Sequence, residues 1–328
     1  MPFARLLLIL AFLAVPAATI AGGGDHQARV WLERMMQAAE KISYEGTFVY
    51  IQGSDVEVMH IVYSKDNVGE IQRMLSLNGP EREVLAADDK VVCLLPQQQV
   101  AFSTSAASQS PFPISLPRDL AKLEMFYRFK MLGKERIANT QTQIIAIEPR
   151  DKLRFGYRLW LDEKSGMVLR SALYDEYDNI VEQLVFTELA IKSSDDVSLR
   201  AVQDSVRAKL ADKAQMAAPG VAVAHSDWQV SEPPEGFMEV MHTRYPGVSS
   251  SHPTEHIVFT DGLATVSVFL EELDTKQAHF KGPTRMGAMN AFADMIDGYQ
   301  IMVVGEVPLA TVALIAASLK RASGAAAQ

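Results

Sequence analysis

The chain has 328 residues, with 31 Lys and Arg against 40 Asp and Glu, which gives a formal net charge of −9. An acidic chain lacks the basic footprint that nucleic acids and anionic lipid surfaces require, so it is a poor candidate for binding either. The single cysteine, Cys93, cannot form an internal disulfide, and the apolar stretch 91–95 around it predicts a buried small hydrophobe rather than a nucleophile. Roughly 300 residues beyond a leader exceed most single cores, so we expect two domains.

The first 21 residues have the pattern of a cleavable secretory signal peptide. Arg5 is followed by the apolar run Leu6–Val15 and by small residues up to Ala21, after which we expect cleavage. A run of this length, at about 1.5 Å per residue, reaches roughly 15 Å, half of a ~30 Å hydrocarbon core, so a permanent anchor is not expected. The alternative is a buried N-terminal helix. The pattern favours an exported protein of the bacterial periplasm or a comparable space, with a net charge of −10 once Arg5 is lost.

Two kinds of periodicity follow the leader. Apolar residues from Gln27 to Ile42 recur at three- and four-residue spacing, which predicts an amphipathic helix. Short β-branched and aromatic runs joined by Gly, Asp and Asn turns then indicate an antiparallel meander. We expect its strands at 47–51, 56–63, 70–77, 83–87, 90–95 and 99–102. The polar, turn-prone stretch from Ser103 to Pro117 predicts a long mobile loop with two isolated apolar residues, Phe112 and Ile114.

Strands resume after a short predicted helix at 118–125. We expect them at 127–132, 134–137, 141–148, 157–162, 168–174 and 180–189. Consecutive apolar residues at 159–161 and 184–186 indicate that both faces of the sheet are partly covered there. A helix on the concave side of a half-barrel would cover them, and so would an apolar ligand cavity. The sequence therefore predicts a strongly curved antiparallel sheet.

A change of composition between 194 and 222 marks a linker or a bridging helix, and we place the domain boundary there. The segment 223–321 is expected to form a second, smaller α+β domain, followed by a disordered tail at 322–328. Its terminal helix is predicted at 308–321, because Pro308 suits a first helical turn. Its strands are expected at 236–244, 256–260 and 264–270, with a further pair around 284–289 and 299–304.

One motif has the spacing of a zinc peptidase, His252-Pro253-Thr254-Glu255-His256. That chemistry needs both histidines on one face of a helix, whereas Pro253 and the strand-like residues after His256 indicate a solvated loop followed by a strand. A nucleophile elbow and a phosphate-binding glycine loop are both absent from the sequence. We expect no catalytic residues, no metal and no cofactor.

The aromatic and methionine residues of the first half are ordinarily core, but an open lipid-type cavity would use the same residue types. Composition leaves both interpretations open. The candidate cavity residues are Phe48, Tyr50, Met59, Tyr63, Met74, Phe102, Phe112, Ile114, Phe126 and Trp160. We further hypothesise that the loop at 103–117, with Phe112 and Ile114, forms the lip of such a cavity.

Six segments, in a fixed order along both halves, carry a family resemblance. They are 43–48 (SYEGTF), 79–84 (GPEREV), 157–162 (YRLWLD), 226–228 with 234–237 (SDW, PEGF), 260–268 (TDGLATVSV) and 303–308 (VVGEVP). On these the chain resembles the RseB/MucB family, periplasmic negative regulators of the envelope-stress, alginate-type sigma-factor pathway. The resemblance covers essentially all of the chain beyond the leader.

This resemblance implies an α+β fold whose domain 26–193 is a half-open antiparallel β-barrel around helices, similar to lipoprotein carriers and able to sense lipid. It implies that domain 223–321 docks the periplasmic part of a single-span membrane anti-sigma factor and shields it from site-1 proteolysis. A lipid or lipopolysaccharide-type ligand would release the partner, and a homodimer is possible within this picture. Two alternatives stay open, a periplasmic lipid or lipoprotein carrier and a zinc peptidase built on His252, Glu255 and His256.

Overall fold

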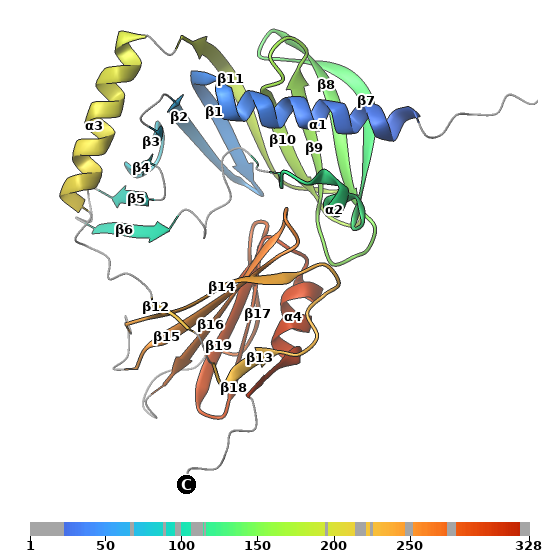
Figure 1. Cartoon of the computed structure of the whole chain (residues 1–328), viewed down its shortest axis with the longest axis vertical. Coiled ribbons are helices and arrows are strands. Elements are labelled where there is room, and N and C mark those ends of the chain that lie inside the picture. Colours follow the sequence, from blue (N-terminus) through green and yellow to red (C-terminus); the bar gives the residue numbers. More distant parts are fainter. Residues whose placement is uncertain are drawn as a thin grey trace, which may run out of the picture.

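The computed structural model describes two antiparallel sheets, each with its own helices, arranged one above the other (Figure 1). The expected signal peptide lies outside the described residues. Those are 23–65, 69–87, 90–95, 100–105, 114, 116–193, 196–213, 221–223, 226–246, 252–273 and 280–321.

The first sheet has eleven strands within the described residues, in the order β6-β5-β4-β3-β2-β1-β11-β10-β9-β8-β7. The curved antiparallel meander expected from the alternating pattern is confirmed (Figure 1), and among the described residues its two end strands, β6 and β7, do not pair with each other. The strands are β1 (Ser43–Gln52), β2 (Asp55–Lys65), β3 (Glu70–Ser76), β4 (Glu83–Ala87), β5 (Lys90–Leu95), β6 (Val100–Ser105), β7 (Tyr127–Ile137), β8 (Thr140–Pro149), β9 (Gly156–Asp162), β10 (Val168–Tyr174) and β11 (Ile180–Lys192). The two short strands expected at 127–132 and 134–137 form one strand, β7, with an irregularity between Met131 and Lys134.

Helix α1 (Gly23–Lys41) crosses the concave side of the sheet over β7 and β8 (Figure 1). Its apolar stripe packs Leu32 and Met35 against Ile145 and Leu159, all of them buried. Fully burying an aliphatic side chain of this size contributes about 1.5–3 kcal/mol, so the stripe is enough to hold the helix in the half-barrel. The short α2 (Leu120–Glu124) closes the same cluster.

Helix α3 (Val197–Lys213) lies within the stretch expected to be a linker or a bridging helix. It packs Val206 and Leu210 against Ile71 and Leu85 of β3 and β4, and contacts β2 and β5 as well (Figure 1). Lys209 also pairs with the mostly buried Glu83, at 2.7 Å between nitrogen and oxygen. This charged stretch therefore supports the strands of the first sheet beside β1.

The second sheet has seven strands within the described residues, in the order β12-β14-β15-β16-β19-β18-β17, and helix α4 (Leu309–Ser318) packs on β18 and β19. Its strands are β12 (Val221–Ala222), β14 (Met238–Tyr245), β15 (Thr254–Thr260), β16 (Thr265–Glu272), β17 (Gly282–Met286), β18 (Met289–Ile296) and β19 (Tyr299–Gly305). The prediction of one strand pair after residue 280 was incomplete, because β18 forms a hairpin with each neighbour.

The terminal helix ends earlier than predicted. Residues Leu319–Arg321 leave the helix and form β20, which pairs with β13 (Trp228–Val230). Leu319 has extended backbone angles, φ −72° and ψ 127°. The prediction of a helix to Arg321 was wrong because pairing with a distant strand outweighs the local helical pattern.

The two domains meet around a buried ion pair. Arg154 of the first domain donates from Nε to Asp261 of the second, at 2.6 Å, and both side chains have no exposed surface. Tyr127 also donates its hydroxyl to Asp261, at 2.9 Å. The rings of Phe126 and Phe237 lie 4.9 Å from the guanidinium, and the carbonyl of Glu235 accepts a further hydrogen bond. We call these groups the domain clasp.

Replacing Asp261 with Asn tests the clasp. Removing Asp261 would leave Arg154 with the partly exposed Asp151 as its remaining counter-charge. The loss should therefore be at the low end for buried ion pairs, and Asp261→Asn should lower the free energy of unfolding by about 3 kcal/mol. Urea unfolding followed by tryptophan fluorescence would measure the loss. Asp204→Asn, on the exposed surface of α3, is the matched control and should change little. An equal stability of both variants would contradict a stabilising role for the pair.

Candidate ligand-binding cavity

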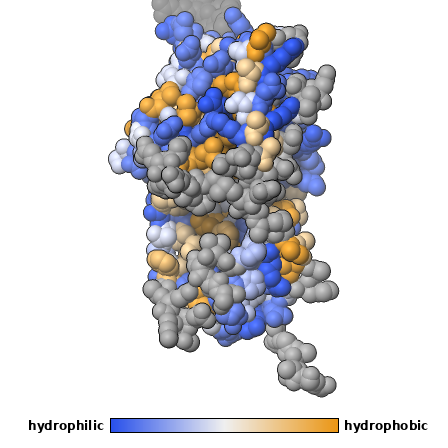
Figure 2. Space-filling view, turned by 90° about the vertical axis from the view of Figure 1, so that its left-hand side faces the viewer, coloured by the Kyte–Doolittle hydropathy of each residue, from blue (hydrophilic) through white to orange (hydrophobic). Residues whose placement is uncertain are grey.

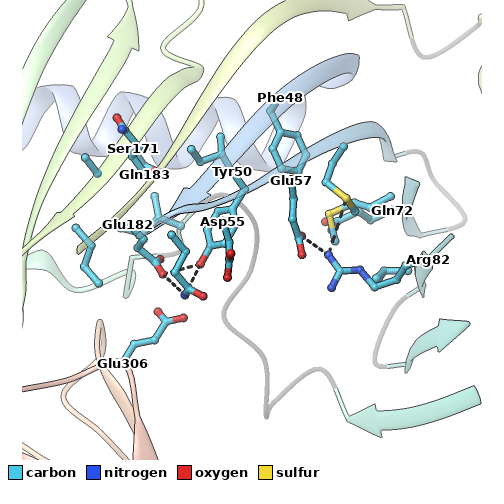
Figure 3. A pocket seen from close by; sticks show the side chains of 18 of the residues that line it. Phe48, Tyr50, Asp55, Glu57, Gln72, Arg82, Ser171, Glu182, Gln183 and Glu306 are labelled. Carbon is cyan, nitrogen blue, oxygen red and sulfur yellow. Dashed lines mark hydrogen bonds and ion pairs between the residues drawn. The ribbon is translucent and has the colours of Figure 1, made fainter. Parts of the chain in front are cut away.

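The concave face of the first sheet encloses a cavity of about 750 Å³ beside the domain boundary (Figure 3). This volume is in the range of small-molecule sites, which are about 300–1,000 Å³. Figure 2 faces this side of the molecule, where hydrophobic side chains appear in the hollow between the two domains. The lining residues are Phe48, Tyr50, Gln52, Asp55, Glu57, Met59, Glu70, Gln72, Met74, Arg82, Val84, Ala86, Val91, Ile114, Tyr157, Ser171, Ala172, Leu173, Glu182, Gln183, Leu184, Met286 and Glu306.

Strand alternation places the lining side chains. Phe48, Tyr50 and Gln52 share one face of β1, and their cross-strand partners on β2 are Met59, Glu57 and Asp55. On the other side of β1, Leu184 pairs with Tyr50 and Glu182 with Gln52. The register therefore gives the cavity an apolar part around Phe48 and a polar part towards the β1–β2 turn.

The structure brings together half of the candidate cavity residues. The residues Phe48, Tyr50, Met59, Met74 and Ile114 line the cavity. Ile114 and Tyr63 also line a neighbouring cavity of about 230 Å³ beneath α1. Their use by a ligand stays a prediction.

Two candidates lie elsewhere. Phe126 belongs to the domain clasp, where its ring stacks on Arg154. Trp160 faces the opposite side of β9, where Arg170 lies 4.1 Å from its ring and its Nε1 donates to Glu135 at 2.6 Å. The cavity role expected for both is corrected. Trp160 lies on the other face of its strand, which residue type does not determine, and Phe126 lies in the turn before β7, where it packs against the second domain.

The two remaining candidates, Phe102 and Phe112, have side chains outside the described residues. Most of the loop hypothesised as a lip lies outside them as well. Cys93, expected to be buried, is half-buried on β5.

Carboxylates are the part of the lining that sequence reasoning missed. Asp55, Glu57, Glu70, Glu182 and Glu306 all face the cavity. Tyr50 donates its hydroxyl to Glu182 at 2.6 Å, and Gln52 donates to the same carboxylate at 3.3 Å. The period-two pattern of β1 and β2 could have shown that Asp55 and Glu57 share a face with Met59. No local signal could have found Glu306, which follows β19 of the second domain.

Glu306 is mostly buried, and its carboxylate points towards Glu182 and Asp55 across the domain boundary (Figure 3). Burial, and secondarily the charge of Glu182, raises the pKa of the Glu306 carboxyl to about 7. Burial removes water that would stabilise the charged form, and a like charge opposes ionisation further. Ionisation of both Glu182 and Glu306 therefore lowers the stability of the folded protein.

The zinc-type motif of the second domain has a structural role. His256 lies in β15 as predicted, but the strand begins at Thr254, so the expectation of a solvated loop was wrong for Thr254 and Glu255. His256 stacks on Phe269 at 4.2 Å, and burial lowers the pKa of its imidazole to about 4. Glu255 accepts from Ser226 at 2.7 Å and contacts His242 at 3.1 Å. Among the residues placed by the structure, no group of three His, Cys, Asp or Glu could hold a metal ion.

The fold defines a protein of two antiparallel-sheet domains, the first of which carries the cavity. In the described part of the chain, no helix is long and apolar enough to cross a membrane. The MucB/RseB N-terminal domain model matches residues 27–212, and the MucB/RseB C-terminal domain model matches residues 222–320. The chain belongs to the MucB/RseB family, as the sequence resemblance predicted.

Known relatives match along nearly their full length. The sigma factor AlgU regulatory protein MucB of Pseudomonas aeruginosa is 29% identical over 96% of each chain. The sigma-E factor regulatory protein RseB of Escherichia coli K12 is 26% identical over 95% of this chain and 94% of the relative. MucB in the solved complex of Pseudomonas aeruginosa MucA and MucB aligns with a TM-score of 0.69 and 26% identity, over 91% of this chain and 100% of that one. The first two relatives are named as regulators of sigma factors.

Removing the charge of Glu306 should stabilise the protein at alkaline pH. The Glu306 carboxyl has a pKa of about 7 in the folded protein, against an ordinary value of 4.5. Between pH 4.5 and pH 7 the folded state therefore binds more protons than the unfolded state, and the free energy of unfolding falls as pH rises through this window. Glu306→Gln should therefore be more stable than the wild type by about 2 kcal/mol at pH 8 and nearly equal at pH 4.5. Chemical denaturation at both pH values would measure the difference.

The matched control is Glu188→Gln, an exposed carboxylate on the strand that carries Glu182. It should show no pH-dependent gain. If Glu306→Gln behaved like this control, the carboxyl would not be held in a repulsive environment.

Proposed function

We propose that this chain is an exported, non-enzymatic regulator of the periplasm that binds the periplasmic part of a transmembrane anti-sigma factor. Binding would shield that partner from the protease that makes the first cut, and a lipid or lipopolysaccharide-type ligand would release it. The match of both MucB/RseB domains in order, including the whole of the MucB chain that is solved with MucA, carries the proposal.

The cavity supports lipid as the signal. Its apolar part, formed by Phe48, Met59 and Met74, suits an acyl chain, and each buried methylene group contributes about 0.8 kcal/mol. Every tenfold change in partner affinity requires about 1.4 kcal/mol of coupling. A few methylene groups would therefore supply enough free energy for a graded switch.

The position of the cavity supports coupling to the second domain. Met286 and Glu306 of that domain line it, and the β17–β18 turn packs Ala288 against Phe155, Leu173 and Val181. A ligand in the first domain therefore contacts the segment expected to dock the partner. By linkage, a ligand that lowers partner affinity must itself be bound more weakly in the complex, by the same factor.

Binding and protection are tested together on the mature chain, residues 22–328. Calorimetric titration with the purified periplasmic fragment of the anti-sigma factor should give a saturable complex, and the complex should resist the first-cut protease. A chain that binds lipid but neither binds nor protects this fragment would be a lipid or lipoprotein carrier instead. Sedimentation of the free protein would show whether it is a homodimer.

Filling the cavity separates the lipid signal from partner binding. Ala86 lines the cavity on β4, so Ala86→Phe should occupy the space of an acyl chain and leave the second domain unchanged. We expect normal binding of the anti-sigma fragment and at least tenfold weaker release by purified lipopolysaccharide or phosphatidylethanolamine, whichever acts on the wild type. Release would be measured by fluorescence anisotropy of the labelled fragment.

Ala190→Phe, on the exposed part of β11, is the matched control and should respond to lipid like the wild type. Normal release from Ala86→Phe would show that lipid acts somewhere other than this cavity.

A further inference from the structure

The polar end of the cavity has an unusual charge balance. Five carboxylates line the whole cavity, but Glu57 is paired with Arg82 and Glu70 with Lys65. The three at the polar end are those of Asp55, Glu182 and Glu306. Among the described lining residues the one cation is Arg82, and its guanidinium is already paired with Glu57 and close to the sulfur of Met59. The cavity therefore offers hydrogen-bond acceptors and negative charge to the head group of a ligand.

The centre of this charge lies where the two domains meet. Glu182 comes from β11 of the first domain, and Glu306 reaches it from the end of β19 in the second (Figure 3). The other titratable groups that face them are the hydroxyls of Tyr50 and Tyr157 and the carboxylate of Asp55. No cation among the described lining residues faces this group directly, since Arg82 lies at the Glu57 side of the cavity (Figure 3).

Such an arrangement lowers stability, because Glu182 accepts hydrogen bonds from Tyr50 and Gln52 but has no cation to balance its charge and that of Glu306 among the described lining residues. Burial, and secondarily repulsion by the neighbouring Glu182 carboxylate, raises the pKa of Glu306 to about 7, so this carboxyl keeps its proton up to about neutral pH. Perturbed carboxyl groups in a cavity are typical of functional sites. A ligand with a positive charge would convert this repulsion into attraction.

We propose that the cavity binds an amphiphile with a primary ammonium head, whose nitrogen donates to Glu182 of the first domain and Glu306 of the second while its chain lies along Phe48, Met59 and Met74. The ammonium group has three donors and no acceptor, which matches a lining rich in acceptors. This inference rests on the lipid-binding part of the proposed function and names the class of its ligand.

A phosphorylated head group does not suit this end of the cavity. Its charge would face Asp55, Glu182 and Glu306, and Arg82 could contact it only by giving up Glu57. Repulsion between like charges costs more free energy in a partly dry site than in water, because the effective dielectric constant is lower. A lipopolysaccharide-type ligand would have to leave its phosphates outside and insert its chains alone.

The head-group preference of the cavity can be measured directly with ligands that have the same decyl chain and different head groups. Decylamine, decanol and decyl phosphate, each below its micelle concentration, would be titrated calorimetrically into the mature chain at pH 8, with propylamine as the amine that lacks a chain. We expect decylamine to bind at least tenfold tighter than decanol, and decyl phosphate to bind more weakly than decanol. Propylamine should show no saturable binding.

Variants assign the effect to the two carboxylates. Glu306→Gln and Glu182→Gln should each weaken decylamine about tenfold and leave decanol unchanged, whereas Glu188→Gln should match the wild type for all ligands. Decylamine affinity should also rise about tenfold from pH 5.5 to pH 8, because the bound ammonium requires the proton to leave Glu306. Glu306→Gln should lose most of this pH dependence.

The outcomes separate this inference from the proposed function. Equal binding of the three decyl ligands, or tighter binding of decyl phosphate, would overturn the ammonium site and leave a lipid cavity of another specificity. If propylamine bound as tightly as decylamine, the ligand would not need an apolar chain, and the site would bind a small free amine instead of an amphiphile. If no decyl ligand bound at all, both the ammonium site and the lipid-sensing part of the proposed function would fail.

Discussion

A buried guanidinium is the constraint on which the arrangement of the two domains depends. Arg154 has no exposed side-chain surface, and a charge removed from water needs both a counter-charge and hydrogen-bond acceptors. Asp151 of its own domain supplies one partly exposed counter-charge, and the second domain supplies the buried one, Asp261, together with the carbonyl of Glu235. Moving the domains apart would remove the buried partners of Arg154, so the docked arrangement is favoured, and Glu306 is held against the cavity as a consequence.

Local pattern was sufficient for most of the first sheet, because the alternation that defines a strand is a property of neighbouring residues. It failed where a partner distant in the sequence decides the structure. Leu319 continues the apolar face of α4, yet its backbone is extended because it pairs with Val230 of β13. The sequence did not predict strand β18, because Asn290, Ala291 and Ala293 have low β-propensity. The strand forms because it pairs with both β17 and β19.

The cavity was predictable in its residue types but not in its chemistry. Aromatic and methionine side chains on β1 to β3 do line it, since a curved sheet must cover its concave face with apolar groups. Trp160 belongs to the same class of residue but faces the other side of β9, a distinction that depends on the register. Carboxylates such as Glu57 and Glu182 resemble ordinary solvated charges in the sequence, and only the fold brings Glu306 of the other domain beside them.

The magnitudes of these interactions restrict how a ligand could act on a partner. Tenfold coupling requires about 1.4 kcal/mol, whereas breaking a buried ion pair costs about 3 kcal/mol or more. On the proposed function, a graded lipid signal is therefore too small to separate the domains at the clasp. It is large enough to shift the groups at the domain boundary that touch the ligand, Glu306 and the β17–β18 turn, while Arg154 keeps Asp261. The clasp would then serve as the fixed pivot for a small displacement of the second domain, and the partner would detect that displacement at its docking surface.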